Sequence, residues 1–171
     1  AMIIIEGADC TGKTTLAKKI CEFQNAQYIH CSYHDSWNIK AYHRLLLHSA
    51  GKLEEMANVP CVIDRWALSE AAYGTTYRDG PSYDTAALSQ EAIKAYNPTF
   101  ILCRTDSAIG THNRMKSERP EMFKNIAPVL TTFDKLASEG KHGTYILFDY
   151  EKHDIDLFVE AFAKPKRREH V

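Results

Sequence analysis

The sequence lacks several features that would define a class of function at once. No apolar stretch reaches the roughly 18 residues that a membrane-spanning helix needs, so no membrane span is expected. The eight histidines and five cysteines form no C-x-x-C pair and no H-E-x-x-H sequence, which argues against a structural zinc site or another transition-metal centre. An odd number of cysteines without such spacing is typical of reduced, mostly buried thiols. We therefore expect a cytoplasmic protein rather than a disulfide framework.

Strong charge of one sign is also missing. The formal net charge is −1, so no broad positive field attracts nucleic acid or a membrane surface, and neither is expected as a partner. Basic residues concentrate only in residues 164–171, which we expect to be a solvated, frayed tail. The length of 171 residues and the hydrophobic content of 44% suit one globular domain covering residues 1–171.

The most informative segment lies near the start of the chain. An apolar run, residues 2–5, precedes Gly7, and Gly12, Lys13 and Thr14 follow before a helical pattern, giving G-x-x-x-x-G-K-T between a strand and a helix. This is the context that a phosphate-binding loop requires. The glycines allow backbone N–H groups to approach phosphate oxygens, the lysine supplies a cation, and the threonine hydroxyl can bind Mg²⁺. The loop is completed by Asp9, Cys10, Thr11 and Thr15.

Helical and strand patterns alternate through the rest of the chain. Helices are predicted over residues 13–24, 36–57, 67–77, 85–96, 107–117, 121–138 and 155–163, and strands over residues 2–5, 27–31, 61–63, 99–103 and 144–148. Short, continuous apolar strands between helices indicate an α/β fold whose parallel sheet is covered on both faces. In the long helix, capped by Ser36, the predicted apolar positions are Ile39, Tyr42, Leu46, Ala50, Leu53 and Ala57.

Asp64 and Arg65 follow the third predicted strand. Because the carboxyl ends of parallel strands meet at one edge of the sheet, both residues should face the phosphate loop. Arg65 can bind a phosphate with two hydrogen bonds. Asp64 can hold the water shell of Mg²⁺ or accept a proton, so Thr14 and Asp64 are the predicted metal-binding residues.

A second group of cations lies in a polar stretch, residues 114–122, which we expect to be a short lid. Arg114, Lys116 and Arg119 could bring positive charge to a transferred phosphoryl group when the lid closes and excludes water. Arg119 and Arg114 are therefore candidate catalytic residues beside Lys13, Arg65 and Asp64.

These motifs together resemble the thymidylate kinase family of P-loop nucleoside monophosphate kinases. Residues 6–15 resemble the family's E-G-x-D-x-x-G-K-T-T opening, residues 64–73 its D-R-x-x-x-S-x-x-A-Y segment, and residues 118–121 its D-R-x-E lid motif. The resemblance implies a three-layer P-loop kinase fold with a five-stranded parallel sheet in the order 2-3-1-4-5. The chain is short for the family, like small viral or phage-type members, for which the cytoplasm would be that of the host.

The resemblance also implies roles for matched positions. Asp9 would approach the 3′-hydroxyl of the acceptor nucleotide, and Arg65 its 5′-phosphate. Tyr73 would border the deoxyribose, and Ser69 belongs to the same matched segment. Arg119 would bring lid charge to the ATP phosphates, since Cys10 stands where some members carry an arginine.

Three positions depart from the family pattern. Gly74 replaces a glutamine, residues 29–34 replace a proline-containing segment, and Arg104 replaces an acidic residue after the fourth strand. These departures leave the phosphate chemistry intact and weaken the inference to thymine as the base.

We expect a kinase that uses ATP and Mg²⁺ to phosphorylate a (deoxy)nucleoside monophosphate, dTMP or a related pyrimidine deoxynucleotide. One alternative is a P-loop kinase acting on a modified base or on a nucleotide within DNA. Another is a nucleotide-binding regulatory module without kinase activity, although the N-K-x-D base motif of GTPases is missing. A homodimer through the helix of residues 36–57 is a further expectation from the resemblance.

Overall fold

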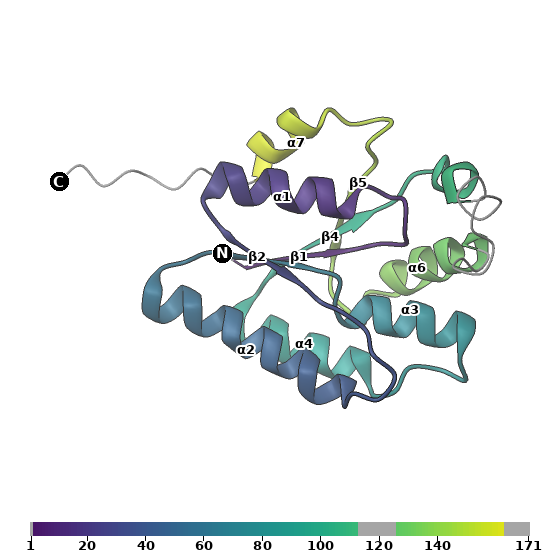
Figure 1. Cartoon of the computed structure of the whole chain (residues 1–171), viewed down its shortest axis with the longest axis horizontal. Helices are drawn as coiled ribbons and strands as arrows, with labels where there is room; N and C mark the ends of the chain where they lie inside the picture. Colours follow the sequence, from purple (N-terminus) through teal and green to yellow (C-terminus); the bar gives the residue numbers. More distant parts are fainter. Residues whose placement is uncertain (1, 113–125, 163–171) are drawn as a thin grey trace.

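The computed structural model describes residues 2–112 and 126–162 (Figure 1). Its sheet has five parallel strands in the order β2-β3-β1-β4-β5. The strands are β1 (Ile3–Glu6), β2 (Gln27–His30), β3 (Cys61–Asp64), β4 (Thr99–Cys103) and β5 (Tyr145–Phe148). The helices with defined bounds are α1 (Lys13–Gln24), α2 (Ile39–Ala57), α3 (Ala67–Tyr77), α4 (Thr85–Tyr96), α6 (Ala127–Glu139) and α7 (Ile155–Phe162). The predicted α/β class and strand order are both confirmed.

The apolar run after Met2 forms the central strand, β1. All four of its residues are buried because β3 and β4 flank it and helices cover both of its faces. Ile5 is paired with Asp64 on one side and with Ile101 on the other. This register brings the phosphate loop, which follows β1, beside the carboxyl end of β3.

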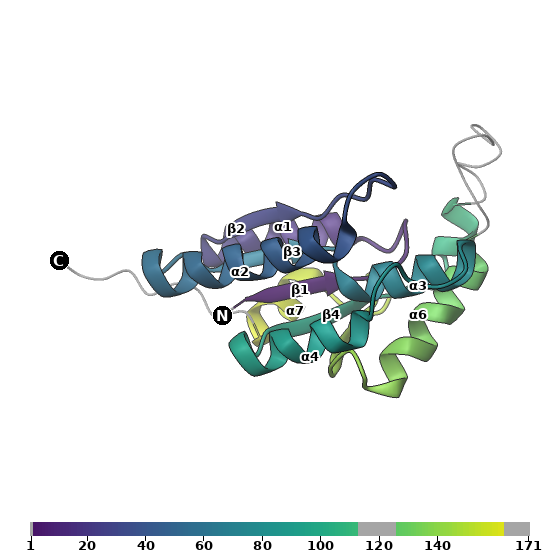
Figure 2. The ribbon, with the colours of Figure 1, turned by 90° about the horizontal axis from the view of Figure 1, so that it is seen from below.

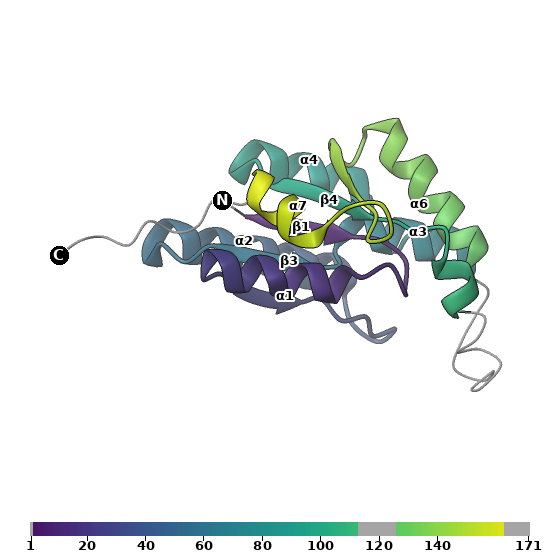
Figure 3. The ribbon, with the colours of Figure 1, turned by 90° about the horizontal axis from the view of Figure 1, so that it is seen from above.

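Helices form a layer on each side of the sheet. α2 and α4 cover one face, which Figure 2 shows from below, and α1 and α7 cover the other, which Figure 3 shows from above. Alternate residues of the strands supply the two cores: Ile4 and Ile63 pack with Leu47 of α2, whereas Ile5 and Val62 pack with the helices of the opposite face. The predicted three-layer arrangement follows from this alternation.

A third apolar cluster lies between α3 and α6 and includes Leu102 of β4. Leu68 and Ala72 of α3 pack there against Val129 and Phe133 of α6. Arg104, the position that departs from the family pattern, connects β4 to this unit, because its Nε donates to both carboxylate oxygens of Asp134 at 3.0 and 2.9 Å.

The long second helix differs from its prediction in its start and its buried face. α2 begins at Ile39, and Asn38 caps it by accepting from the N–H of Ala41 at 3.1 Å, whereas the Ser36 hydroxyl bonds the ring of His34. The buried face includes His43, Leu47 and Gly51 in addition to Ile39 and Ala50. Tyr42 and Leu46 are only partly buried, and Leu53 and Ala57 are exposed. The predicted stripe was right at Ile39 and Ala50 and wrong at its other positions, because the buried row continues from Ile39 through His43 to Leu47 rather than through Tyr42 and Leu46.

Several other predictions concern element bounds or undescribed residues. α6 begins at Ala127, after Ile126, and Pro128 occupies its first turn, where proline is favoured. The predicted start at residue 121 lies outside the described residues. Residues 108–112 are helical, as predicted for part of 107–117. The lid cations Arg114, Lys116 and Arg119 and the tail 164–171 lie outside the described residues. Dimerisation and the single-domain organisation stay predictions.

Among the helices that the structure describes, none combines the length and the apolar character that crossing a membrane would require.

Candidate phosphate-transfer site

The phosphate loop depends on backbone conformations that glycine tolerates. Gly7 has φ 145°, and a Cβ at this position would collide with the carbonyl oxygen of Cys103. Gly12 has φ 80° and directly precedes α1, so the chain can turn into the helix there. Cys10 also lies in the left-handed region, at φ 65°. The first turn of α1 thus borders the loop, and unpaired N–H groups at a helix start favour anions.

Lys13 lies buried under the loop. Its Nζ donates to the carbonyl oxygen of Ala8 at 3.0 Å, and the Thr11 hydroxyl donates to the same oxygen at 2.6 Å. Burial, followed by the positive charge of Arg65, lowers the pKa of Lys13 to about 8. A phosphate group entering the loop would supply the negative charge that this buried ammonium lacks.

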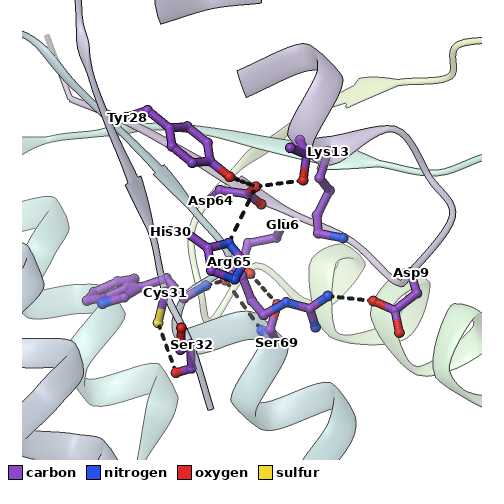
Figure 4. Close-up of polar contacts among 12 residues, drawn as sticks. Glu6, Asp9, Lys13, Tyr28, His30, Cys31, Ser32, Asp64, Arg65 and Ser69 are labelled. Atoms are coloured by element: carbon purple, nitrogen blue, oxygen red, sulfur yellow. Dashed lines mark hydrogen bonds and ion pairs between the residues drawn. The ribbon is translucent and has the colours of Figure 1, made fainter. Parts of the chain in front are cut away.

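The Asp64 carboxylate, at the end of β3, contacts side chains of α1 and β2 (Figure 4). Its Oδ2 accepts from the Thr14 hydroxyl of α1 at 3.1 Å and from the Tyr28 hydroxyl of β2 at 2.6 Å. His30 Nδ1 lies 3.8 Å from the same oxygen. Asp64 is only 1% exposed, so these neighbours fix its orientation toward the loop.

Arg65 connects β3 to the phosphate loop. Its Nη2 donates to Asp9 Oδ1 at 2.8 Å, and its guanidinium lies 4.9 Å from the centre of the Tyr73 ring. The Tyr73 hydroxyl in turn accepts from the N–H of Asp9 at 3.2 Å. Arg65 has φ 73°, a strained conformation for a non-glycine residue, which its backbone hydrogen bond to Ile5 at 2.8 Å helps to hold.

Glu6 holds the start of α3 against β1. Its fully buried carboxylate accepts from the N–H groups of Trp66 and Leu68 at 2.9 and 2.7 Å and from the Ser69 hydroxyl at 2.5 Å. Burial raises the pKa of Glu6. A carboxylate at this position complements the positive end of the α3 dipole. Ser69 was predicted to bind a ligand; its hydroxyl donates to Glu6, and its ligand-binding role stays a prediction.

Two cavities meet at this site. The Tyr73 cavity has a volume of about 570 Å³. It is lined by Asp9, His30, Cys31, Ser32, Tyr33, His43, Arg65, Trp66, Ser69, Glu70, Tyr73, Tyr77 and Arg78. The loop cavity has a volume of about 260 Å³ and is lined by Asp9, Cys10, Gly12, Lys13, Thr14, Thr15, His30, Asp64 and Arg65. Asp9, His30 and Arg65 border both, so they mark the passage between the two cavities.

A third cavity, the Tyr150 cavity, lies on the other side of the phosphate loop. It has a volume of about 570 Å³, and its lining includes Gly12, Thr15, Tyr150 and His153. A Cβ on Gly12 would approach the Tyr150 ring to 3.2 Å, and the Tyr150 hydroxyl lies 3.0 Å from the Ser107 hydroxyl. The loop therefore separates two cavities large enough for nucleosides.

The far wall of the Tyr73 cavity explains one departure from the family pattern. Glu70 accepts from both terminal nitrogens of Arg78 at 3.0 Å and from the N–H of Ser82 at 3.0 Å. These bonds hold the segment after α3 against the helix at Gly74, where a Cβ would lie 2.8 Å from the carbonyl oxygen of Gly80. A glutamine at position 74 would displace this segment.

The sequence-predicted residues within the described chain thus come together at the carboxyl edge of the sheet. Sequence reasoning missed Tyr28 and His30, which lie at the end of the edge strand β2, and also His43, Arg78 and Tyr150. Strand position could have indicated Tyr28 and His30. Nothing in the local pattern distinguishes His43 or Tyr150 from ordinary helix and loop residues.

Within the described residues, no three His, Cys, Asp or Glu side chains gather as ligands of a metal ion. The oxygens of Thr14 and Asp64, 3.1 Å apart beside Lys13, nevertheless fit the sparse protein ligation that Mg²⁺ accepts when phosphates and water complete its shell.

Solved structures share the fold. The chain superposes on the YorR protein of Bacillus subtilis, solved with phosphorylated GDP, with a TM-score of 0.68 and 21% identity over 94% of this chain and 92% of that one. It superposes on deoxyadenosine kinase from M. mycoides, solved with dCMP and dCDP, with a TM-score of 0.56 and 12% identity over 94% and 96%. At these identities the likeness establishes the fold alone: an α/β fold, which in this chain has a parallel sheet in the order 2-3-1-4-5.

A curated relative is similar in sequence. A protein of Acidianus bottle-shaped virus (isolate Italy/Pozzuoli), named "Putative thymidylate kinase", is 32% identical over 101 residues, which cover 56% of this chain and 62% of the relative. The matched region thus spans about three fifths of the relative's length. No protein-family model matches the chain.

Proposed function

We propose that the chain is an ATP-dependent nucleoside monophosphate kinase of the thymidylate kinase type, with dTMP or a related pyrimidine deoxynucleotide as acceptor. One observation carries this proposal: a phosphate loop with its buried Lys13 opens onto two cavities, one on each side. A hydrolase or a nucleotide-dependent switch needs room for one nucleotide, whereas a kinase that joins two substrates needs room for both.

ATP would bind with its β- and γ-phosphates in the loop cavity, against the N–H groups of residues 10–15 and the ammonium of Lys13. Its base would then extend into the Tyr150 cavity, where the exposed ring of Tyr150 offers a stacking surface beside Gly12. The proposed lid residues Arg114 and Arg119, which lie outside the described residues, would add positive charge.

Thr14 and Asp64 would hold Mg²⁺, Asp64 through bound water. When bound, the ion would neutralise negative charge that develops on the phosphates during transfer. The Tyr28 hydroxyl, 2.6 Å from Asp64 Oδ2, keeps this carboxylate directed toward the loop.

The acceptor monophosphate would occupy the Tyr73 cavity. Arg65 would bind its phosphate, and Asp9 would accept a hydrogen bond from the 3′-hydroxyl of its sugar. Tyr73, whose ring lies under the Arg65 guanidinium, would contact the face of the sugar and leave no room for a 2′-hydroxyl. An oxygen of the acceptor phosphate would attack the γ-phosphorus in line, forming the new P–O bond while the bond to the β-phosphate oxygen breaks and ADP leaves.

Because the acceptor oxygen is already anionic near neutral pH, the protein needs only to position the two substrates and to neutralise the charge of their phosphates. Lys13 and Arg65 both line the loop cavity, so both would neutralise negative charge on the transferred group.

An assay with γ-labelled ATP against a panel of mononucleotides, nucleosides and duplex DNA tests this function. Label on a deoxynucleoside monophosphate, giving the diphosphate, is the expected result. Label found only on DNA would favour the kinase of nucleotides within DNA, and nucleotide binding without transfer to any acceptor would favour a regulatory module.

A further inference from the structure

The Tyr73 cavity contains a buried histidine whose position is fixed at two points. His43 lies on the inner face of α2, is 4% exposed, and lines the cavity. Its Nδ1 lies 2.6 Å from the Tyr83 hydroxyl, and its backbone carbonyl accepts from Trp66 Nε1 at 2.9 Å. The imidazole therefore has one ring nitrogen engaged on the protein side and one remaining, Nε2.

The hydrogen bond to Tyr83 determines what Nε2 can do. Burial raises the pKa of Tyr83, so its hydroxyl stays protonated, and burial lowers the pKa of His43 to about 4, so the ring is neutral near pH 7. A neutral imidazole that accepts from the Tyr83 hydroxyl at Nδ1 carries its proton on Nε2. In this tautomer, the one that gives the Tyr83 hydroxyl an acceptor, His43 would offer an Nε2–H donor to a ligand in the cavity.

The charged groups of the same wall also favour acceptors on the ligand. Both oxygens of Glu70 are engaged by Arg78, and one of them also accepts from the N–H of Ser82. Arg78 still has N–H groups beyond those bonds and the one to the Tyr33 hydroxyl at 3.1 Å. Arg78 therefore offers N–H donors on this wall, from which a carbonyl oxygen of the ligand could accept.

Resting on the kinase function proposed above, we propose that His43 is a specificity-determining residue that donates a hydrogen bond to the acceptor base and selects a 4-oxo pyrimidine over a 4-amino pyrimidine. The class of substrate it selects is a uracil or thymine nucleotide. Tyr83 acts through His43 as a positioning residue, because it keeps the proton on Nε2.

The chain supplies a matched control on the same helix. His48 of α2 has its Nδ1 2.7 Å from the Tyr96 hydroxyl of α4, and the ring centres lie 5.6 Å apart, as in the His43–Tyr83 pair. His48 is not among the residues that line the Tyr73 cavity. A general loss of stability from removing a histidine–tyrosine pair should appear on substitution of either His43 or His48. A change in base selection should appear only on substitution of His43.

The experiment compares the wild type with His43→Phe, His43→Gln and His48→Phe, measuring kcat/KM for dTMP, dUMP and dCMP and the affinity for each by calorimetry. We expect the wild type to prefer dUMP to dCMP, and His43→Phe to reduce that preference by about tenfold, through KM and Kd rather than kcat. His43→Gln, which keeps an N–H donor, should retain part of the preference, and His48→Phe all of it.

An unchanged preference in His43→Phe, or a wild type that prefers dCMP, would overturn the inference. Should His43→Phe fail to fold, Tyr83→Phe provides the same comparison, with a reduced preference expected. If the wild type phosphorylates no mononucleotide, the proposed function fails, while the calorimetric preference for dUMP still tests the base contact by itself.

Discussion

Arg65 Nη2 donates to Asp9 Oδ1 across 2.8 Å, and this ion pair stands at the passage between the Tyr73 and loop cavities. In the free protein the two residues neutralise each other. In the proposed complex the acceptor phosphate would take over Arg65, and the 3′-hydroxyl of the sugar would take over Asp9. The pair thus holds both side chains near their binding positions before the substrate arrives.

Replacing Asp9 should abolish discrimination at the 3′ position of the sugar. We expect the wild type to use dTMP about tenfold better in kcat/KM than its 3′-deoxy analogue, because the analogue leaves the carboxylate unpaired. Asp9→Ala should have nearly the same kcat/KM for dTMP and for its 3′-deoxy analogue. Steady-state kinetics with both acceptors gives the answer, and discrimination that survives in Asp9→Ala would contradict the assigned role.

Lys13→Ala should remove the charge that stabilises the transferred phosphoryl group. We expect kcat to fall by at least about 10²-fold. Lys18→Ala, on the exposed side of the same helix, is the control and should keep wild-type turnover. Wild-type activity in Lys13→Ala with ATP, Mg²⁺ and every acceptor would exclude the proposed mechanism.

Gly74→Ala should destabilise the protein and loosen the far wall of the Tyr73 cavity. The added Cβ would lie 2.8 Å from both the Gly80 carbonyl oxygen and Pro81 Cα, so the segment held by Glu70 must move. We expect a loss of about 1–3 kcal/mol in the free energy of unfolding and a raised KM for the acceptor. Gly110→Ala, where a Cβ would meet no atom within 4 Å, is the matched control for urea unfolding. Equal stability of the two variants would show that this contact is unimportant.

His43 should make stability depend on pH. Its folded-state pKa, about 4 because of burial, lies below the ordinary value of 6.5, so the unfolded chain binds more protons between these values. The contribution of neutral His43 to the free energy of unfolding is complete above pH 6.5 and is lost as the pH falls toward 4. It amounts to about 3 kcal/mol in all. Urea unfolding at pH 4.5 and pH 7 should show a smaller difference for His43→Phe than for the wild type. The same pH dependence in both would refute this buried, neutral state.

Sequence patterns predicted most of the fold because local signals and tertiary structure agree. The phosphate loop required one conformation at Gly7 and Gly12, and continuous apolar strands required a sheet covered on both faces. On α2, the burial of His43 was not predicted because its partner Tyr83 lies 40 residues away in the sequence. No periodicity records such a contact.

The candidate site was predictable where a motif carries chemistry in adjacent residues, as in Lys13 and Thr14. It was not predictable where the chain folds back on itself. Tyr28 reaches Asp64 from an edge strand, and Arg78 reaches Glu70 from the segment after α3. From the sequence, Gly74 indicated the loss of a contact to the base. In the structure, the absence of a Cβ at Gly74 leaves room for the backbone of Gly80.

Phosphorus NMR of a mixture of the protein with ATP, Mg²⁺ and dTMP follows the proposed phosphoryl transfer itself. We expect the γ-phosphate signal of ATP to disappear while the signals of ADP and dTDP grow in equal amounts, and we expect Lys13→Ala to suppress both changes. Inorganic phosphate as the only new product, or no change with any deoxynucleoside monophosphate in place of dTMP, would contradict it.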